Sequence, residues 1–120
     1  MQLVSWFEIP AKDFDRAVKF YEDLFEIKLN KTEDENEQMA FFPAKANVSG
    51  AISKARNFKP AADGPVIYFN AKGKLDKYID SCIKSGGKVI RQKTEIDEGR
   101  GFFAMVSDSE GNRIGFYSEI

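Results

Sequence analysis

The sequence predicts an α+β domain built from two tandem copies of a β-α-β-β-β module, and three observations predict it. Two amphipathic helical stripes begin 61 residues apart, at Phe14 and at Leu75. One strand-like segment precedes each stripe and three follow it, in the same order in both halves. A stretch rich in Pro, Gly and Asp, residues 55–65, has the composition of a linker between the halves. We therefore expect a single domain with module one at about residues 1–57 and module two at about residues 62–120.

The two helices are predicted near residues 13–26 and 74–85. In the first, apolar residues recur in steps of three and four and form one face: Phe14, Ala17, Val18, Tyr21, Leu24 and Phe25. Asp13 stands where a helix N-cap belongs. The second helix repeats the pattern with Leu75, Tyr78, Ile79, Cys82 and Ile83. It is expected to end at Gly86-Gly87, because glycine adopts a left-handed C-terminal cap at little cost.

Eight short segments rich in apolar residues read as strands, four in each half. Those of the first half span residues 4–9, 27–31, 39–42 and 50–54. Those of the second half span residues 66–70, 88–93, 102–106 and 113–117. The segment DSEGN, residues 108–112, reads as the hairpin turn before the last strand.

Side chains alternate along a strand, so each strand has a row that faces its helix and a row that faces away. Phe7 and Ile9 of the first half, and Ile67, Phe69, Ile114 and Phe116 of the second, are expected to pack inward toward the helices. The opposite row is unusually aromatic for a solvated face. It carries Trp6, Glu8, Tyr68, Asn70, Arg113 and Tyr117. Rings interspersed with a few polar groups are typical of a small-molecule pocket.

Composition narrows the class of partner. Lys and Arg number 18 against 19 Asp and Glu, for a net charge of -1, so no basic face for nucleic acid is expected. No apolar run approaches membrane-spanning length, and the N-terminus lacks a signal-peptide pattern. A single cysteine fits a reducing compartment. We expect a cytoplasmic protein whose partner is a small molecule, with no membrane or nucleic acid involved.

Three segments carry a resemblance to a known family: FEIPAKDFDRAVKFY (7–21), SGGKVI (85–90) and GFFAMVSDSEGNRIGFY (101–117). Together they resemble the vicinal oxygen chelate superfamily, which includes glyoxalase I, bleomycin resistance proteins and extradiol dioxygenases. The resemblance covers the whole chain. It implies a curved, cup-like mixed β-sheet with the helices outside and the ligand on the concave face. Members of this family commonly pair, and an open sheet leaves edges and apolar surface, so we expect a homodimer.

The resemblance also implies where a metal would bind. In metal-dependent members, His or Glu ligands lie on the first, fourth, fifth and eighth strands. Here those positions fall on Trp6, on residues 50–52, on Val66 (or Pro65) and on Gly115, and the chain has no histidine. We therefore expect no metal and no cofactor, and the metal-dependent activities of the family are not expected.

Three functions remain open. The first is metal-free binding or sequestration of a small molecule, as in resistance proteins. The second is a metal-independent enzyme with Glu8 as general base, since a carboxylate among rings suits that role. The third is a lyase or isomerase of the glyoxalase type in which a partner chain supplies the metal ligands.

The predicted ligand-binding residues are Trp6, Glu8, Tyr68, Asn70 and Tyr117, with Arg100 on a movable rim loop, DEGRG (97–101). The alternative for Glu8 is a structural carboxylate, and the alternative for Tyr68, Asn70 and Tyr117 is plain lining of the sheet. The alternative for the loop of residues 97–101 is a plain hairpin loop. Arg113 is either an anion-binding group or a solvated one.

Overall fold

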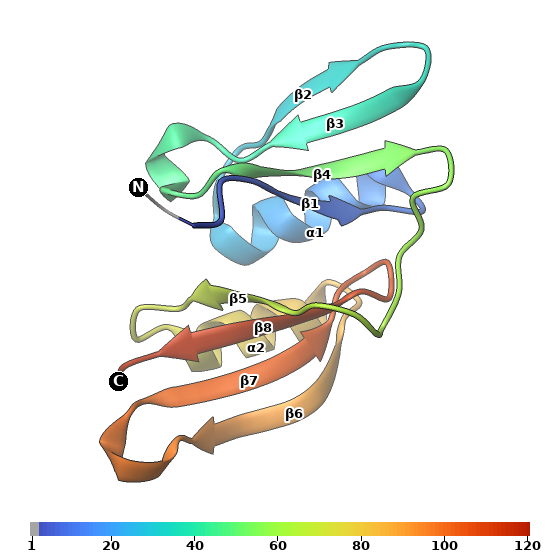
Figure 1. The fold of residues 1–120 in the computed structure, drawn as a ribbon. Helices are drawn as coiled ribbons and strands as arrows, with labels where there is room; N and C mark the ends of the chain where they lie inside the picture. Colours follow the sequence, from blue (N-terminus) through green and yellow to red (C-terminus); the bar gives the residue numbers. More distant parts are fainter. Residues whose placement is uncertain (1–2) are drawn as a thin grey trace. The chain divides into compact units, whose positions relative to one another are not determined.

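The computed structural model describes residues 3–120 and divides the chain into two compact units, Met1–Pro60 and Ala61–Ile120. In the first unit β1 (Phe7–Pro10) leads into α1 (Phe14–Phe25), and three strands follow: β2 (Asn30–Glu33), β3 (Glu37–Phe41) and β4 (Gly50–Ala55). In the second unit β5 (Ile67–Asn70) leads into α2 (Leu75–Lys84), followed by β6 (Lys88–Glu95), β7 (Phe102–Ser107) and β8 (Arg113–Ser118). The element order is thus the same in both units (Figure 1).

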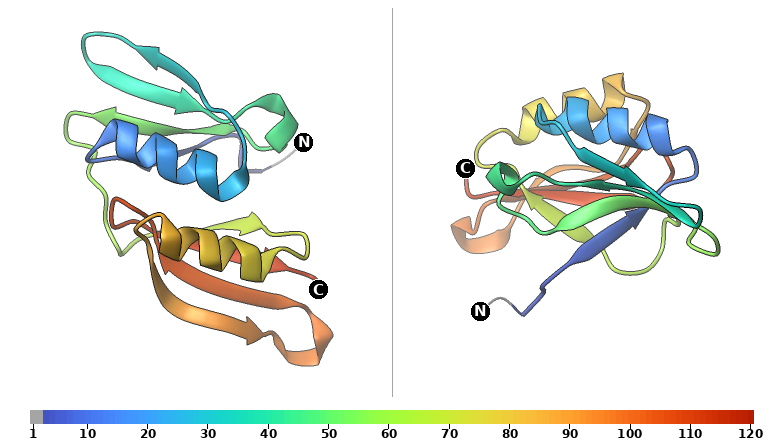
Figure 2. Two further views of the ribbon diagram at one scale, coloured as in Figure 1. Left: turned by 180° about the vertical axis from the view of Figure 1, so that it is seen from behind. Right: turned by 90° about the horizontal axis from the view of Figure 1, so that it is seen from above.

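The two units also share one sheet topology. The strand order is β1-β4-β3-β2 in the first sheet and β5-β8-β7-β6 in the second. In each sheet the first and last strands of the unit pair in parallel, and the remaining pairs are antiparallel. Each helix lies along one face of its own sheet (Figure 2). The predicted α+β architecture of two βαβββ repeats is confirmed.

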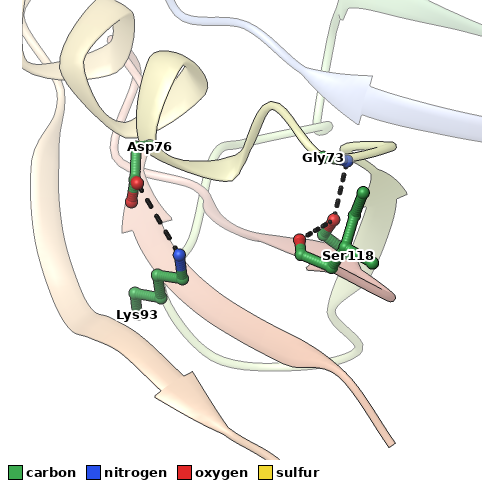
Figure 3. Close-up of polar contacts among 5 residues, drawn as sticks. Gly73, Asp76, Lys93 and Ser118 are labelled. Carbon is green, nitrogen blue, oxygen red and sulfur yellow. Dashed lines mark hydrogen bonds and ion pairs between the residues drawn. The ribbon is translucent and has the colours of Figure 1, made fainter.

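The joint between the first strand and the helix is built alike in both units. The backbone N–H of Ala11 donates to the carbonyl of Ser53 at 2.9 Å, and that of Ala71 donates to the carbonyl of Tyr117 at 2.6 Å. In the second unit a further contact secures this joint: the Ser118 hydroxyl accepts from the N–H of Gly73 at 2.7 Å (Figure 3). The parallel strand pair is thereby tied to the start of the helix.

α1 buries its predicted stripe except for Phe25, which is half-buried, and it also buries Phe20. α2 buries only part of its predicted stripe. Asp13 caps α1 through a bond from the N–H of Arg16 to its carboxylate at 3.1 Å, as predicted. In α2 only Leu75 and Cys82 are buried, and Ile83 is 52% exposed although the pattern placed it in the stripe. Ile83 follows Cys82 directly and therefore points about 100° away from the buried row around the helix.

Two strands begin three residues later than predicted, and each has a local reason. β2 starts at Asn30 rather than Ile27, because the end of α1 continues into a capped turn in which Glu26 is left-handed. There Glu22 accepts from Ile27 N–H through its carbonyl (3.2 Å) and from Leu29 N–H through its carboxylate (2.9 Å). β1 starts at Phe7 rather than Val4, because pairing with β4 begins at Gly50.

The predicted turn before the last strand is organised by a buried carboxylate. Asp108 accepts from the backbone N–H groups of Glu110 and Asn112 at 2.8 and 2.9 Å, and from the Asn112 amide at 3.0 Å. Asn112 in turn accepts from the N–H of Ala61 at 3.2 Å. The turn therefore fixes the start of the second unit as well as the β7–β8 hairpin.

Across residues 3–120, no helix combines the length and the apolar character needed to cross a bilayer.

Candidate ligand-binding site

The second sheet has one face toward α2 and one face away from it. Phe69, Ile114 and Phe116 are buried toward α2, and the alternating residues Tyr68 and Tyr117 project from the opposite face. Tyr68 is 45% exposed. This outer face of the second sheet is the aromatic row that the sequence indicated in this half of the chain.

An open cavity of about 380 Å³ lies on this face. It is lined by Tyr68, Ile96, Phe103 and Tyr117. The rings of Tyr68 and Phe103 meet edge to face, with 6.4 Å between centroids. Three aromatic walls and one aliphatic wall suit the apolar body of a small molecule. We refer to this cavity as the aromatic cavity.

A glycine allows Tyr68 to form the floor of the aromatic cavity. Tyr68 on β5 is paired with Gly115 on β8. A Cβ atom placed on Gly115 would lie 3.0 Å from Cγ of the Tyr68 ring and closer still to Cδ1 and Cε1. The ring therefore lies directly over the glycine, in space that any side chain at position 115 would need.

The predicted rim loop adjoins the aromatic cavity through Tyr117. The Tyr117 hydroxyl donates to the backbone carbonyl of Arg100 at 2.7 Å, and the N–H of Ile96 donates to the carbonyl of Gly101 at 2.7 Å. The Arg100 guanidinium pairs with the Glu98 carboxylate at 2.8 Å. Arg100 thus reaches the site with its carbonyl, while its side chain is paired within the loop.

Two polar residues of the predicted row serve local structure. The Asn70 side-chain carbonyl accepts from the N–H of Lys72 at 3.0 Å and holds the turn that leads toward α2. The Arg113 guanidinium donates to the carbonyl of Ala62 from Nε at 2.8 Å and also from a terminal nitrogen. Arg113 therefore anchors the segment before β5, a role that the sequence did not indicate.

The other two predicted residues belong to the first unit. The indole N–H of Trp6 donates to the Glu8 carboxylate at 3.0 Å, and the Trp6 ring contacts Phe41 with 5.8 Å between centroids. Both Trp6 and Glu8 are exposed, whereas the next residue, Ile9, is buried. The structure thus joins Trp6 to Glu8 in one unit and Tyr68 to Tyr117 and the Arg100 loop in the other.

Sequence reasoning missed two residues that line the aromatic cavity, Ile96 and Phe103. It also missed Arg91, which contacts the Phe103 ring. Phe103 could have been found, because it alternates with the more central Ala104 in β7. Arg91 could not, since its guanidinium carbon comes to 4.9 Å from the Phe103 ring centroid only where the β6–β7 register shifts on both sides of it.

Cys82 lies apart from this face, within the α2 core. Burial, and after it the negative charge of Asp108, raise the pKa of the Cys82 thiol to about 12. The thiol therefore stays protonated at neutral pH and packs as a small apolar group, as the sequence indicated.

Comparison with known proteins defines the family. The family model described as Glyoxalase/Bleomycin resistance protein/Dioxygenase superfamily matches residues 3–116, and the chain belongs to this superfamily. A glyoxylase-like domain-containing protein from Didymella fabae is 30% identical over 115 residues, which cover 91% of this chain and 88% of that protein.

Solved structures show the same fold. A glyoxalase/bleomycin resistance protein from Albidiferax ferrireducens superposes with a TM-score of 0.72 at 18% identity, covering 98% of both chains. A fosfomycin resistance protein from Listeria monocytogenes superposes with a TM-score of 0.73 at 13% identity, covering 98% of this chain and 93% of that one. At these identities the likeness concerns the fold.

Proposed function

We propose that this protein binds a small organic molecule in the aromatic cavity, without a metal ion, and so sequesters it as resistance proteins do. The observation that carries the proposal is the cavity itself, whose walls are the side chains of Tyr68, Ile96, Phe103 and Tyr117. Such walls gain free energy by covering an apolar ligand, roughly 25 cal/mol for each Å² removed from water.

The residues at the metal-ligand positions of the family do not fit a divalent ion. The indole nitrogen of Trp6 carries a hydrogen, which it donates to Glu8, and has no lone pair to offer. Gly115 has no side chain, and the Tyr68 ring fills the space above it. Val66 and residues 50–52, Gly-Ala-Ile, supply no imidazole, thiolate or carboxylate. These residues support a binding mode that does not depend on a metal.

Two measurements on the purified protein test this proposal. Mass spectrometry of compounds released from freshly purified protein should find an organic molecule that is depleted when Tyr68→Ala protein is prepared in parallel. Elemental analysis after dialysis should find zinc, nickel and iron far below one equivalent per chain. Stoichiometric metal would contradict the metal-free mode.

We propose further that the protein is a homodimer. In each hydrogen-bonded sheet of the described chain, an outer strand, β2 or β6, pairs on one side only. Ile90 on β6 is a large apolar side chain with about half of its surface exposed. Such edges favour pairing with another copy. Light scattering at micromolar concentration should give twice the chain mass, and a monomer mass would refute the dimer.

A second candidate function uses Glu8 as a general base, and one contact favours it. The Trp6 indole fixes one oxygen of the Glu8 carboxylate at 3.0 Å. A carboxylate held in one orientation is suited to accept a proton from a bound molecule. Glu8→Gln should abolish turnover of the substrate and preserve the fold. If the protein only binds at this pair, Trp6→Ala would weaken affinity more than Glu8→Gln, because it removes the larger contact area.

A further inference from the structure

We infer that the molecule taken up by the aromatic cavity is an organic anion with a flat apolar body, and that Arg91 binds its negative group. This inference rests on the proposed function and adds the chemical class of the ligand. It also assigns a binding role to a residue that the sequence did not single out.

Strand register places Arg91 on the same face as the aromatic cavity. Arg91 on β6 pairs with Met105, Met105 pairs with Gly115, and Gly115 pairs with Tyr68. Paired residues on neighbouring strands share a face, so this row runs across the sheet from Arg91 to the Tyr68 ring. The adjacent row carries Phe103 and Tyr117, which are also paired.

The Arg91 guanidinium lies over a wall of the cavity. Its central carbon is 4.9 Å from the centroid of the Phe103 ring. The positive charge is attracted to the electron-rich face of the ring, and the guanidinium carries five N–H donors with which it can bind an anion. An oxyanion seated beside Phe103 could therefore receive charge-assisted hydrogen bonds from Arg91.

Among the described residues, Arg91 has no carboxylate partner. Its one hydrogen bond there is a long one, 3.4 Å from Nε to the Thr94 hydroxyl. By contrast, Arg100 pairs with Glu98, and Arg113 donates to the Ala62 carbonyl. An unpaired guanidinium over an aromatic wall favours a ligand that brings its own negative charge.

The residues that line the cavity indicate the chemical character of the rest of the ligand. All four lining residues have apolar or aromatic side chains, and none is acidic. The rings of Tyr68 and Phe103, in edge-to-face contact, suit a planar body better than a bulky one. The expected ligand class is therefore an aromatic carboxylate, sulfonate or phosphate.

A pair of fluorescent probes tests this inference. The anion 8-anilinonaphthalene-1-sulfonate and the neutral N-phenyl-1-naphthylamine share a similar aromatic framework and differ in charge. We expect the folded protein to bind the anion more tightly, with an affinity that falls as salt is added. Arg91→Gln should weaken binding of the anion about tenfold and leave binding of the neutral probe unchanged. Arg91→Lys should restore part of the anion affinity, since it keeps the charge and loses the planar array of N–H donors.

Lys93 provides a matched control. Lys93 is on the same strand as Arg91 and lies over an aromatic ring, that of Phe102, at 4.8 Å from its centroid. Unlike Arg91, it is paired with a carboxylate, that of Asp76, at 3.6 Å (Figure 3). Phe102 is paired with Ser118, a buried residue, and not with the cavity row. Lys93→Gln should therefore leave both probes unaffected, and circular dichroism of each variant verifies the fold.

The outcomes separate the two proposals. If both probes bind but Arg91→Gln changes the affinity for neither, or changes both affinities equally, the inferred ligand class is wrong. The proposal that the cavity binds a small molecule without a metal then still stands. If Lys93→Gln weakens the anion as much as Arg91→Gln, general charge and not Arg91 attracts it, and the inference again fails. If neither probe binds the folded protein, both the inference and the binding role of the cavity are refuted.

Discussion

The contact between Tyr68 and Gly115 predicts how a methyl group added at position 115 changes the stability of the protein. In Gly115→Ala the new Cβ would lie 3.0 Å from the ring Cγ and nearer to two further ring carbons, whereas carbon atoms prefer about 3.5–4.0 Å. The ring must therefore withdraw from the sheet. Because Tyr68 is a flexible side chain and 45% exposed, it can move without displacing the backbone. We expect a loss of about 1 kcal/mol in the free energy of unfolding, at the low end for overpacking.

The assay is urea unfolding followed by circular dichroism, together with binding of the anionic probe. A loss of that size lowers the melting temperature by about 4 °C in a domain of this length. Probe affinity should fall as well, because the floor of the aromatic cavity is displaced. In Gly87→Ala the new Cβ would instead lie 2.5 Å from the backbone carbonyl oxygen of Ser107, which cannot swing away. That variant should lose several times more stability.

A double variant decides the mechanism. Once Tyr68→Ala has removed the ring, adding Gly115→Ala should cost almost nothing, so the two changes are strongly non-additive. If Gly115→Ala costs as much in the Tyr68→Ala background as in the wild type, the ring is not what requires the glycine. An unchanged stability of the single variant would refute the reasoning equally.

Three further predictions concern the loop, the thiol and the capped turn. Tyr117→Phe removes the hydroxyl that donates to the backbone carbonyl of Arg100. The free energy that protects the amides of residues 97–101 from hydrogen exchange should therefore fall by up to about 1 kcal/mol. Unchanged exchange rates of these amides would contradict this prediction. An unfolded cysteine loses its proton near pH 8.5, whereas Cys82 in the fold keeps it to about pH 12. The folded state therefore binds more protons in this window, and stability falls as pH rises through it. Cys82→Ala should flatten this alkaline decline, measured by urea unfolding at several pH values. Asp108→Ala leaves donors of the buried turn without an acceptor and should cost about 2–3 kcal/mol, read from the same unfolding curves.

The fold was predictable because its signals are periodic and local. The stripes that begin at Phe14 and Leu75 and the cap at Asp13 each depend on residues close together in the chain, and the two halves repeat one order. Ile83 was misplaced because a short helix offers few turns over which to fix the orientation of its face. The start of β2 was misplaced because Glu22 reaches forward to cap the turn after α1, a contact that apolar patterning does not report.

The candidate site was predictable only in part, for a physical reason. Alternation along single strands placed Tyr68 and Tyr117 on one face. The roles of Arg113 and Asn70 depend on where neighbouring loops end, at Ala62 and Lys72, and strand patterns contain no such information. Arg91 depends on irregular pairing between β6 and β7, which shifts the register by an amount that the sequence does not display.

Metal-free binding in the aromatic cavity is tested most directly by titrating 8-anilinonaphthalene-1-sulfonate into the folded protein by calorimetry. One titration is made in excess EDTA and one each with an equivalent of zinc, nickel or iron(II) and no chelator. If the cavity lined by Tyr68, Ile96, Phe103 and Tyr117 binds the probe without a metal, as we propose, the affinity should be the same in every titration and should fall in Tyr68→Ala protein. Binding that appears only with a metal, or that is indifferent to Tyr68→Ala, would contradict the proposal.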